Sequence, residues 1–456
     1  MELRVEWALL PEGLARHVVV EVGADGQIVG VARDVSPAGG RFLPGLLVPG
    51  MPNLHSHGFQ RAMAGAAEVA AGAEGSFWGW RSVMYRFVEQ LTPADTAAIT
   101  AFAYLEMLEA GYTSVAEFHY LHHKPGGAVF KPAHKMSVAV RGAAERAGIR
   151  QLLLPTLYQY GNFGGKPLGD AQRRFFHSTD DFIALFDALV SSESPSLKTG
   201  LALHSLRAVS NESLRAVAAV ARRESLVRPV HIHVAEQTRE VQDCLVAYGR
   251  RPVEHLLESG EMGRHWCLVH ATHVTASELA GMAAQGVVLG LCPTTEANLG
   301  DGRFPLDEFL AQGGRFGIGS DSHVSLDPRE ELRLQEYTLR LWRESRVLTA
   351  TAEQPHVGTA LWQGAVAGGA QAFGFPAAGL AVGAPGDALL LDTDRAEFAA
   401  VTPQAWLDAW LFAPRAQAID RVWVGGREMV TRGRHIARAR IERAYKTAVK
   451  RLIAAA

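Results

Sequence analysis

The feature that most constrains the fold is an alternation of short apolar runs with longer segments of helical period, repeated from residue 46 to residue 322. Most of the runs are almost continuously apolar, which is typical of parallel strands buried on both faces. The longer segments, such as "NESLRAVAAVARRES", open with helix-capping residues. Eight runs are strand candidates: "GLLVPGMPNLH", "TSVAEFHY", "RQLLLPTLY", "KTGLALHSL", "RPVHIHVAE", "WCLVHATHV", "GVVLGLCPT" and "RFGIGSDSH". Eight strand–helix units predict an α/β fold, a (β/α)8 TIM-like barrel.

The two ends of the chain have a different pattern. Residues 1–49 contain short alternating strands around "GADGQ", and residues 380–435 contain "RVWVGGREMV", in which two glycines between apolar runs indicate a hairpin. We therefore expect a small β-sandwich domain built from both termini, over residues 1–49 and 376–456, beside a barrel domain over residues 50–375. The last segment has helical spacing and is expected to pack as a terminal helix.

Composition and charge exclude several classes of partner. The 456 residues carry 45 basic and 47 acidic side chains, a net charge of -2, without a long run of either sign. This balance gives no electrostatic footprint for nucleic acid or an anionic membrane, so we expect a small-molecule substrate. The N-terminus lacks the apolar core of a signal peptide. Three cysteines without a Cys-x-x-Cys spacing indicate reduced thiols, and a cytoplasmic protein is predicted.

Polar side chains gather at the ends of the predicted strands. A barrel of this kind keeps its chemistry at the carboxyl ends of its strands, where these side chains would meet. They are His55 and His57 after the first strand, His119 and Tyr120 after the second, His204 and Arg207 after the fourth, His233 and Glu236 after the fifth, His270 and His273 after the sixth, and Asp321 after the eighth.

The stretch "NLHSHG" places His55 and His57 two residues apart, so that on a strand both point to the same side. Two convergent imidazoles make half of a metal site. A third imidazole from "HIHVAE", either His231 or His233, and the carboxylate of Asp321 would complete three nitrogens and one oxygen, a suitable shell for zinc. The residues alone leave the choice between His231 and His233 open.

Two long loops are expected to form lids or substrate walls at the same end of the barrel. The first covers residues 59–87 and includes Arg81, and the second follows the third strand. The loop after the second strand carries His122 and His123, which we expect to be solvated. Arg207 fits a substrate carboxylate, although a salt bridge at a helix N-terminus explains it equally well from the residues alone.

Four motifs, "PGMPNLHSHG", "HIHVAEQ", "LVHATH" and "GIGSDSH", resemble the signatures of the amidohydrolase superfamily, in particular its deaminase branch. The resemblance covers essentially the whole chain and implies the barrel and flanking β-sandwich typical of that superfamily. It implies His55, His57, His233 and Asp321 as metal ligands, and Glu236, His270 and Asp321 as catalytic residues. The fourth strand end, "GLALHSL", offers no lysine to bridge two metals. One divalent metal is therefore expected, zinc with iron(II) as the alternative.

Further stretches, "FQRAMAG", "FWGWR", "AEFHYLHH", "LALHSLRAV" and "SDSHVSLDPREELR", resemble the family of formimidoylglutamate deiminases. This resemblance implies metal-dependent hydrolysis of N-formimino-L-glutamate to N-formyl-L-glutamate and ammonia in histidine degradation, by a homodimer. It implies a substrate-binding set of Gln60, Arg81, Tyr120, His204 and Arg207. The alternatives are another deaminase of guanine, cytosine or s-triazine type, or a non-catalytic metal-binding scaffold.

Overall fold

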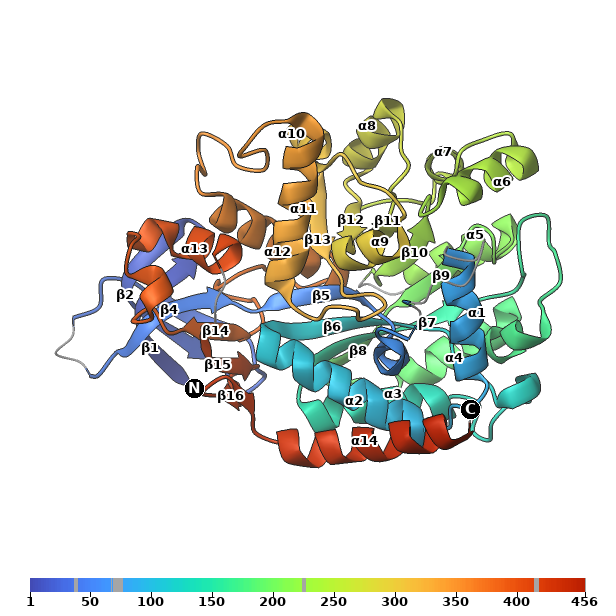
Figure 1. The fold of residues 1–456 in the computed structure, drawn as a ribbon, viewed down its shortest axis with the longest axis horizontal. Helices are drawn as coiled ribbons and strands as arrows, with labels where there is room; N and C mark the ends of the chain where they lie inside the picture. Colours follow the sequence, from blue (N-terminus) through green and yellow to red (C-terminus); the bar gives the residue numbers. More distant parts are fainter. Residues whose placement is uncertain (37–39, 67, 69–76, 224–226, 414–417, 456) are drawn as a thin grey trace.

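The computed structural model describes residues 1–36, 40–66, 68, 77–223, 227–413 and 418–455. Its centre is a closed parallel barrel (Figure 1). The eight barrel strands are β5 (Met51–Ser56), β6 (Tyr112–His119), β7 (Arg150–Leu157), β9 (Leu201–Ser205), β10 (Val230–Val234), β11 (Trp266–His270), β12 (Val288–Leu291) and β13 (Arg315–Ile318), with the short β8 (Leu197–Thr199) beside β7. Each strand pairs with its neighbour in parallel, and β13 beside β5 and β6 beside β7 complete the ring. The predicted (β/α)8 barrel is therefore confirmed.

Helices follow the strands and surround the barrel (Figure 1). They are α2 (Pro93–Ala110), α3 (Lys135–Ala147), α4 (Thr179–Val190), α5 (Asn211–Ala221), α6 (Thr238–Tyr248), α7 (Pro252–Ser259), α8 (Ala276–Gln285), α9 (Pro293–Leu299), α10 (Leu306–Ala311), α11 (Pro328–Arg343) and α12 (Val357–Phe373). A Cβ on Gly368 of α12 would lie 1.8 Å from the carbonyl oxygen of Phe316 in β13. Only glycine therefore lets α12 lie directly on this strand.

The helix α2 begins with a reciprocal cap. The hydroxyl of Thr92 accepts from the backbone N–H of Asp95 at 3.2 Å, and the Asp95 carboxylate accepts from the backbone N–H of Thr92 at 3.0 Å. Two N–H groups that the helix itself leaves unpaired are thereby satisfied. The helix buries Ile99, Phe102 and Leu105 in the core beside β5 and β6.

We expect Thr92→Ala to destabilise the first turn of α2 by about 1 kcal/mol, because the alanine cannot accept the Asp95 N–H. Hydrogen exchange at the Asp95 and Thr96 amides should speed up by about 5-fold, the factor that corresponds to this free energy. Thr92→Ser keeps the acceptor and is the matched control. Equal exchange rates in the alanine and serine variants would contradict the role of the cap.

The terminal segments form one continuous sheet beside the barrel, seen at the left of Figure 1. Its order is β17 (Arg434–His435), β16 (Arg427–Thr431), β15 (Ile419–Val424), β14 (Ala388–Leu391), β4 (Leu43–Pro49), β1 (Glu2–Leu10), β2 (Gly13–Val22) and β3 (Ile28–Ala32). The predicted hairpin joins β15 to β16 through Gly425 and Gly426, whose φ angles of 54° and 78° favour glycine. Strands from both ends of the chain thus share one sheet, as predicted.

A buried ion pair joins this sheet to the barrel. The guanidinium of Arg150, the first residue of β7, donates two hydrogen bonds of 3.0 Å to the carboxylate of Asp387, which precedes β14. The carboxylate also accepts the N–H of Gly425 at 2.7 Å. Both side chains are less than a tenth exposed. Removing either partner would leave a buried charge without compensation, so the pair fixes how the two sheets are placed.

The remaining helices lie at the surface. The terminal helix α14 (Arg438–Ala455) packs on α2, where Phe102 and Tyr445 stack with ring centroids 4.2 Å apart (Figure 1). α13 (Trp406–Phe412) lies against α12. Short 3-10 turns cover η2 (Gly58–Met63), η4 (Pro125–Gly127), η5 (Asp170–Phe175), η6 (Ala396–Phe398) and η7 (Pro403–Ala405). Within the described part of the chain, every helix is too short or too polar to cross a lipid bilayer.

The long loop predicted over residues 59–87 is partly helical. Residues 77–88 form α1 (Phe77–Val88), while residues 67 and 69–76 lie outside the described residues. The prediction of a loop was wrong for α1, where Met84 and Val88 are buried and supply the apolar face that a short helix needs. This helix carries Arg81, which lines the same pocket as residues at the ends of the barrel strands, among them His233 and Asp321.

Candidate active site

Four side chains meet where β5, β10 and β13 end. The Nε2 atom of His55 lies 3.1 Å from that of His57 and 3.0 Å from that of His233. One carboxylate oxygen of Asp321 lies 3.4 Å from His55 Nε2 and 3.2 Å from His57 Nε2. All four residues are buried, and their nearest ligand atoms lie within 4.8 Å of one another. The structure thus brings together the four residues that the sequence predicts as metal ligands.

The rings of this cluster are oriented for a cation. Nδ1 of His57 donates to the carbonyl of Phe118 at 2.9 Å, and Nδ1 of His233 donates to the carbonyl of His204 at the same distance. Because Nδ1 carries the proton in each ring, the other nitrogen, Nε2, is free of a proton and faces the centre of the cluster. Converging lone pairs repel one another unless a cation lies between them, so the donor set fits a divalent metal.

The charge of the cluster suits a metal as well. Burial lowers the pKa of His55 to about 3 and that of His233 well below its usual value, so both imidazoles are neutral. Burial acts in the opposite direction on Asp321, but the contacts from His55 and His57 hold the pKa of its carboxyl well below the ordinary range. Two neutral imidazoles and one ionised carboxylate are thus among the four predicted ligands, which suits a divalent cation.

Glu236, which follows β10, and His270, the last residue of β11, lie beside this cluster. Nε2 of His270 is 3.8 Å from a Glu236 oxygen and 3.7 Å from an Asp321 oxygen. Burial raises the pKa of Glu236. Burial alone would lower the pKa of His270, but the carboxylates of Glu236, Glu296 and Asp321 outweigh it and raise that pKa to about 10. A proton-carrying imidazole and a carboxylate thus face the same point, as general acid–base chemistry requires.

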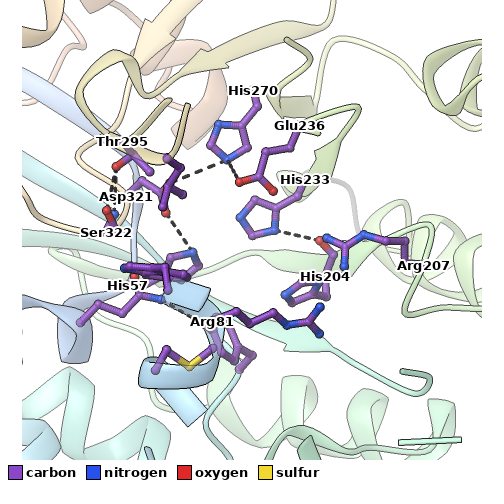
Figure 2. A pocket seen from close by; sticks show the side chains of 15 residues that line it. His57, Arg81, His204, Arg207, His233, Glu236, His270, Thr295, Asp321 and Ser322 are labelled. Atoms are coloured by element: carbon purple, nitrogen blue, oxygen red, sulfur yellow. Dashed lines mark hydrogen bonds and ion pairs between the residues drawn. The ribbon is translucent and has the colours of Figure 1, made fainter. Parts of the chain in front are cut away.

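The predicted substrate-binding residues line the same pocket (Figure 2). The side-chain amide of Gln60 donates to the Tyr120 hydroxyl at 2.9 Å. Arg81 donates to the hydroxyl of Tyr158 at 3.2 Å and contacts Tyr85. His204 lies in β9, and Arg207 follows this strand. All five predicted substrate-binding residues line the pocket: Gln60, Arg81, Tyr120, His204 and Arg207. Five of the predicted metal-binding and catalytic residues line it as well: His57, His233, Glu236, His270 and Asp321.

Two guanidinium groups make one part of this pocket electropositive. The pKa of His204 lies well below its usual value because the ring is buried and because Arg207 and Arg81 are both close to it. A neutral imidazole between two arginines can donate one hydrogen bond without adding a third charge. Groups of this kind bind carboxylates, with arginine giving two parallel hydrogen bonds.

A family comparison matches this arrangement. Residues 46–429 match the model of the Amidohydrolase family. This chain belongs to the amidohydrolase family. It is 47% identical over 441 residues to the formimidoylglutamate deiminase of Pseudomonas aeruginosa, covering 96% of this chain and 97% of that protein. It is 28% identical to a 5-methylthioadenosine/S-adenosylhomocysteine deaminase of Natronomonas pharaonis, covering 92% of this chain and 90% of that protein. Among solved structures, an amidohydrolase from Brucella melitensis superposes with a TM-score of 0.93 at 42% identity, covering 99% of both chains.

One residue of this amidohydrolase site was not predicted from the sequence. Glu296, on α9, accepts from Nδ1 of His270 at 3.1 Å and from the backbone N–H of Cys292 at 2.9 Å. It thereby holds the His270 ring so that Nε2 faces Glu236 and Asp321. The stretch "LCPTTEANLG" carries no recognisable signal for this contact, because it forms between the ends of two neighbouring strands.

The other histidines of the amidohydrolase chain lie outside the ligand cluster. Nε2 of His231 donates to the carbonyl of Ala372 in α12 at 3.0 Å, so His233 is the member of the pair at the cluster. The expectation that His122 and His123 are solvated was wrong, since they are only 2% and 4% exposed. They donate to the carbonyls of Thr156 and Phe176 beneath the loop that follows β7.

Left-handed backbone marks the strand ends of the amidohydrolase site. His270 and Asp321 have φ angles of 69° and 44°, and Ala235, beside Glu236, has 50°. This conformation costs an L-residue about 1–2 kcal/mol relative to ordinary backbone. Such strain persists only where surrounding contacts fix the chain, and here it occurs at the ends of β10, β11 and β13, which carry the functional side chains.

Proposed function

We propose that this amidohydrolase hydrolyses N-formimino-L-glutamate to N-formyl-L-glutamate and ammonia, a reaction of histidine degradation. The observation that carries the proposal is the position of Arg81 and Arg207 in the same pocket as the His–Asp cluster and Glu236. The identity of 47% with a formimidoylglutamate deiminase supports it. N-formimino-L-glutamate has two carboxylates and a small acyclic amidine, and the pocket has a matching group for each.

We propose that the cofactor is one divalent metal, zinc, with iron(II) as the alternative, held by His55, His57, His233 and Asp321. A divalent metal in such a site lowers the pKa of water toward neutrality and so makes hydroxide available at physiological pH. Support comes from the convergent Nε2 atoms and the ionised carboxylate of Asp321. The amino-acid ligands themselves suit zinc, whose preferred protein shell is four-coordinate.

Glu236, His270 and Asp321 are proposed to move and hold the protons. Glu236 accepts a proton from the attacking water and delivers it to the nitrogen that departs from the amidine carbon. His270 holds its ring against Glu236 and Asp321 and polarises the group under attack, while Glu296 keeps that ring in place. Water adds its oxygen to the carbon, the bond from that carbon to the terminal nitrogen breaks, and both protons of the water end on this nitrogen, which leaves as ammonia.

Arg207 and Arg81 are proposed to bind the two carboxylates of the glutamate portion. Arg207 lies just after β9 and Arg81 comes from α1, so the two cations approach the pocket from different elements. His204 between them donates a further hydrogen bond, and Gln60 and Tyr120 bind the substituted amidine nitrogen nearer the cluster. This placement orients the amidine toward Glu236.

The deciding experiment is ammonia release by the purified, metal-loaded protein. N-formimino-L-glutamate should be turned over, while guanine, cytosine, adenosine and an s-triazine should not, because a nucleobase or triazine ring carries no carboxylate for Arg207 and Arg81. Turnover of one of the ring substrates alone would overturn the substrate assignment and leave the hydrolytic centre standing.

The metal content tests the ligand set separately. We expect one divalent ion per chain by elemental analysis, and less than about a tenth of that in His233→Ala. Loss even of a residue that only supports a ligand lowers metal affinity by about 10- to 100-fold, and loss of a ligand should lower it at least as much. His231→Gln on the same strand keeps a side-chain donor for Ala372 and should retain its ion. Two ions per chain, or loss of metal only in the His231 variant, would contradict the assignment.

Three further expectations stay predictions. The family resemblance implies a homodimer, which the mass of the native protein in solution would test. A cytoplasmic location is predicted, and fractionation of cells would test it. The division into a barrel over residues 50–375 and an accessory domain over residues 1–49 and 376–456 can be tested by limited proteolysis at those boundaries.

A further inference from the structure

The substrate pocket has two ends that differ in chemistry. His204 lies near the end of β9, the fourth barrel strand, and Arg207 follows that strand, whereas Ser322 follows β13, the eighth. In a ring of eight strands the fourth and the eighth are opposite each other, so these residues face one another across the barrel. Figure 2 shows Thr295 and Ser322 on one side of Asp321 and the two arginines on the other.

The end away from the arginines is a pair of hydroxyl groups. The Oγ atoms of Thr295 and Ser322 lie 3.0 Å apart, and Thr295 Oγ1 also accepts the backbone N–H of Ser322 at 3.3 Å. Two hydroxyls offer four lone pairs and two donors, and these two bonds use two lone pairs and one donor. Two lone pairs and one O–H therefore remain for a ligand, which suits a nitrogen that carries several hydrogens.

Little room is left around this pair. Thr295 and Ser322 are 1% and 4% exposed. Leu299 lies four residues after Thr295 on α9, on the same side of the helix, and lines the pocket with an apolar surface. A site with such walls admits an amino group but disfavours both a carboxylate and an alkylated nitrogen.

We propose that the Thr295–Ser322 pair is the subsite for the departing nitrogen and restricts it to the unsubstituted form. This inference rests on the proposed function. With the glutamate carboxylates on Arg81 and Arg207 and the amidine carbon beside Glu236, the terminal nitrogen of an extended substrate points to the opposite end of the pocket. There the hydroxyl oxygens accept its hydrogens as the C–N bond breaks and Glu236 supplies the proton that completes ammonia.

The first test separates catalysis from binding. Thr295→Val keeps the shape and removes the hydroxyl, so kcat for N-formimino-L-glutamate should fall about 10- to 100-fold, the usual effect of losing a hydrogen bond to a charged group. KM should stay within about 3-fold, because the carboxylate contacts are untouched. Thr295→Ser restores the hydroxyl and should recover most of kcat. A Thr295→Val enzyme with wild-type kcat, or with only KM changed, would overturn the proposal.

The second test measures selectivity. Thr295→Ala opens the wall of the subsite. The test substrate is N-formimino-L-glutamate methylated on its terminal nitrogen, which releases methylamine. Its kcat/KM, divided by the kcat/KM of the unmethylated substrate, should rise at least about 10-fold, within the range that one methyl-sized difference in a pocket produces. Ser322→Ala provides a second variant with the same expectation. Thr294→Ser is the matched control: its hydroxyl bonds Glu331 at 2.6 Å, so the ratio should stay at the wild-type value.

Rates in both tests are expressed per bound metal ion, so that a variant with less metal is not mistaken for one that has lost a contact to the substrate. An unchanged ratio in both alanine variants, with wild-type turnover of N-formimino-L-glutamate, overturns the subsite and leaves the proposed function intact. Failure of the wild-type protein to release ammonia from N-formimino-L-glutamate overturns the proposed function and the subsite with it.

Discussion

Replacing Glu236 by glutamine is expected to lower kcat by about 10³-fold or more, within the range that general acid–base catalysis supplies. Glutamine has nearly the same shape and fills the same buried space, but its amide cannot accept and return a proton. The four ligand atoms are separate from Glu236, so metal content should stay at one ion per chain. Steady-state ammonia release and elemental analysis on the same preparation measure both quantities.

The matched control is Glu240→Gln. Glu240 is also buried, and its carboxylate accepts the backbone N–H of Glu236 at 3.1 Å, a bond that a glutamine oxygen can keep. Its kcat should stay within about 10-fold of the wild type, since no proton transfer is assigned to it. Full activity in Glu236→Gln would show that a different group acts as the base, and loss of metal in that variant would show that Glu236 acts through the cluster.

Replacing Arg207 by methionine is expected to lower kcat/KM for N-formimino-L-glutamate by about 10²-fold, as loss of a bidentate, charge-assisted contact does. Methionine keeps much of the length of the side chain and removes its charge. For formamidine, which has the amidine but no carboxylate, kcat/KM should stay nearly constant. The selectivity between the two substrates is therefore the quantity to measure.

Arg222→Met is the control for this substitution. Arg222 is an exposed arginine at the end of α5 that pairs with Glu261 at 2.6 Å and does not line the pocket. Its loss should therefore leave the selectivity unchanged. An equal fall for both substrates in Arg207→Met would indicate general disruption of the site. An unchanged selectivity would contradict carboxylate binding by Arg207.

The barrel could be predicted because its signals are local. Each buried parallel strand is a short apolar run, and the rule that chemistry lies at the strand ends places distant residues together without any knowledge of packing. His55, His57 and Asp321 were found in this way, and the structure brings them within contact. The same rule placed Arg207 in the pocket while leaving its role open between a carboxylate contact and a surface salt bridge.

Features that depend on contacts between distant segments were harder to predict. Strand alternation puts His231 and His233 on the same side, and the structure distinguishes them because His233 Nε2 lies 3.0 Å from that of His55, while His231 bonds Ala372 in α12. Glu296 is visible as a partner of His270 only once two neighbouring strand ends are side by side. The burial of His122 and His123 depends on how the loop after β7 folds over them.

The shared terminal sheet has a consequence for how the chain is made. Strand β4 pairs with β1 on one edge at once, but its other edge waits for β14, with Leu47 opposite Leu390. At ordinary rates of synthesis this partner leaves the ribosome about 20 to 70 s later. Until then the nascent protein carries an open, apolar strand edge, the kind of surface that invites pairing with other chains. Pairing of β14 with β4 completes the terminal sheet and therefore ends a period of vulnerability to aggregation.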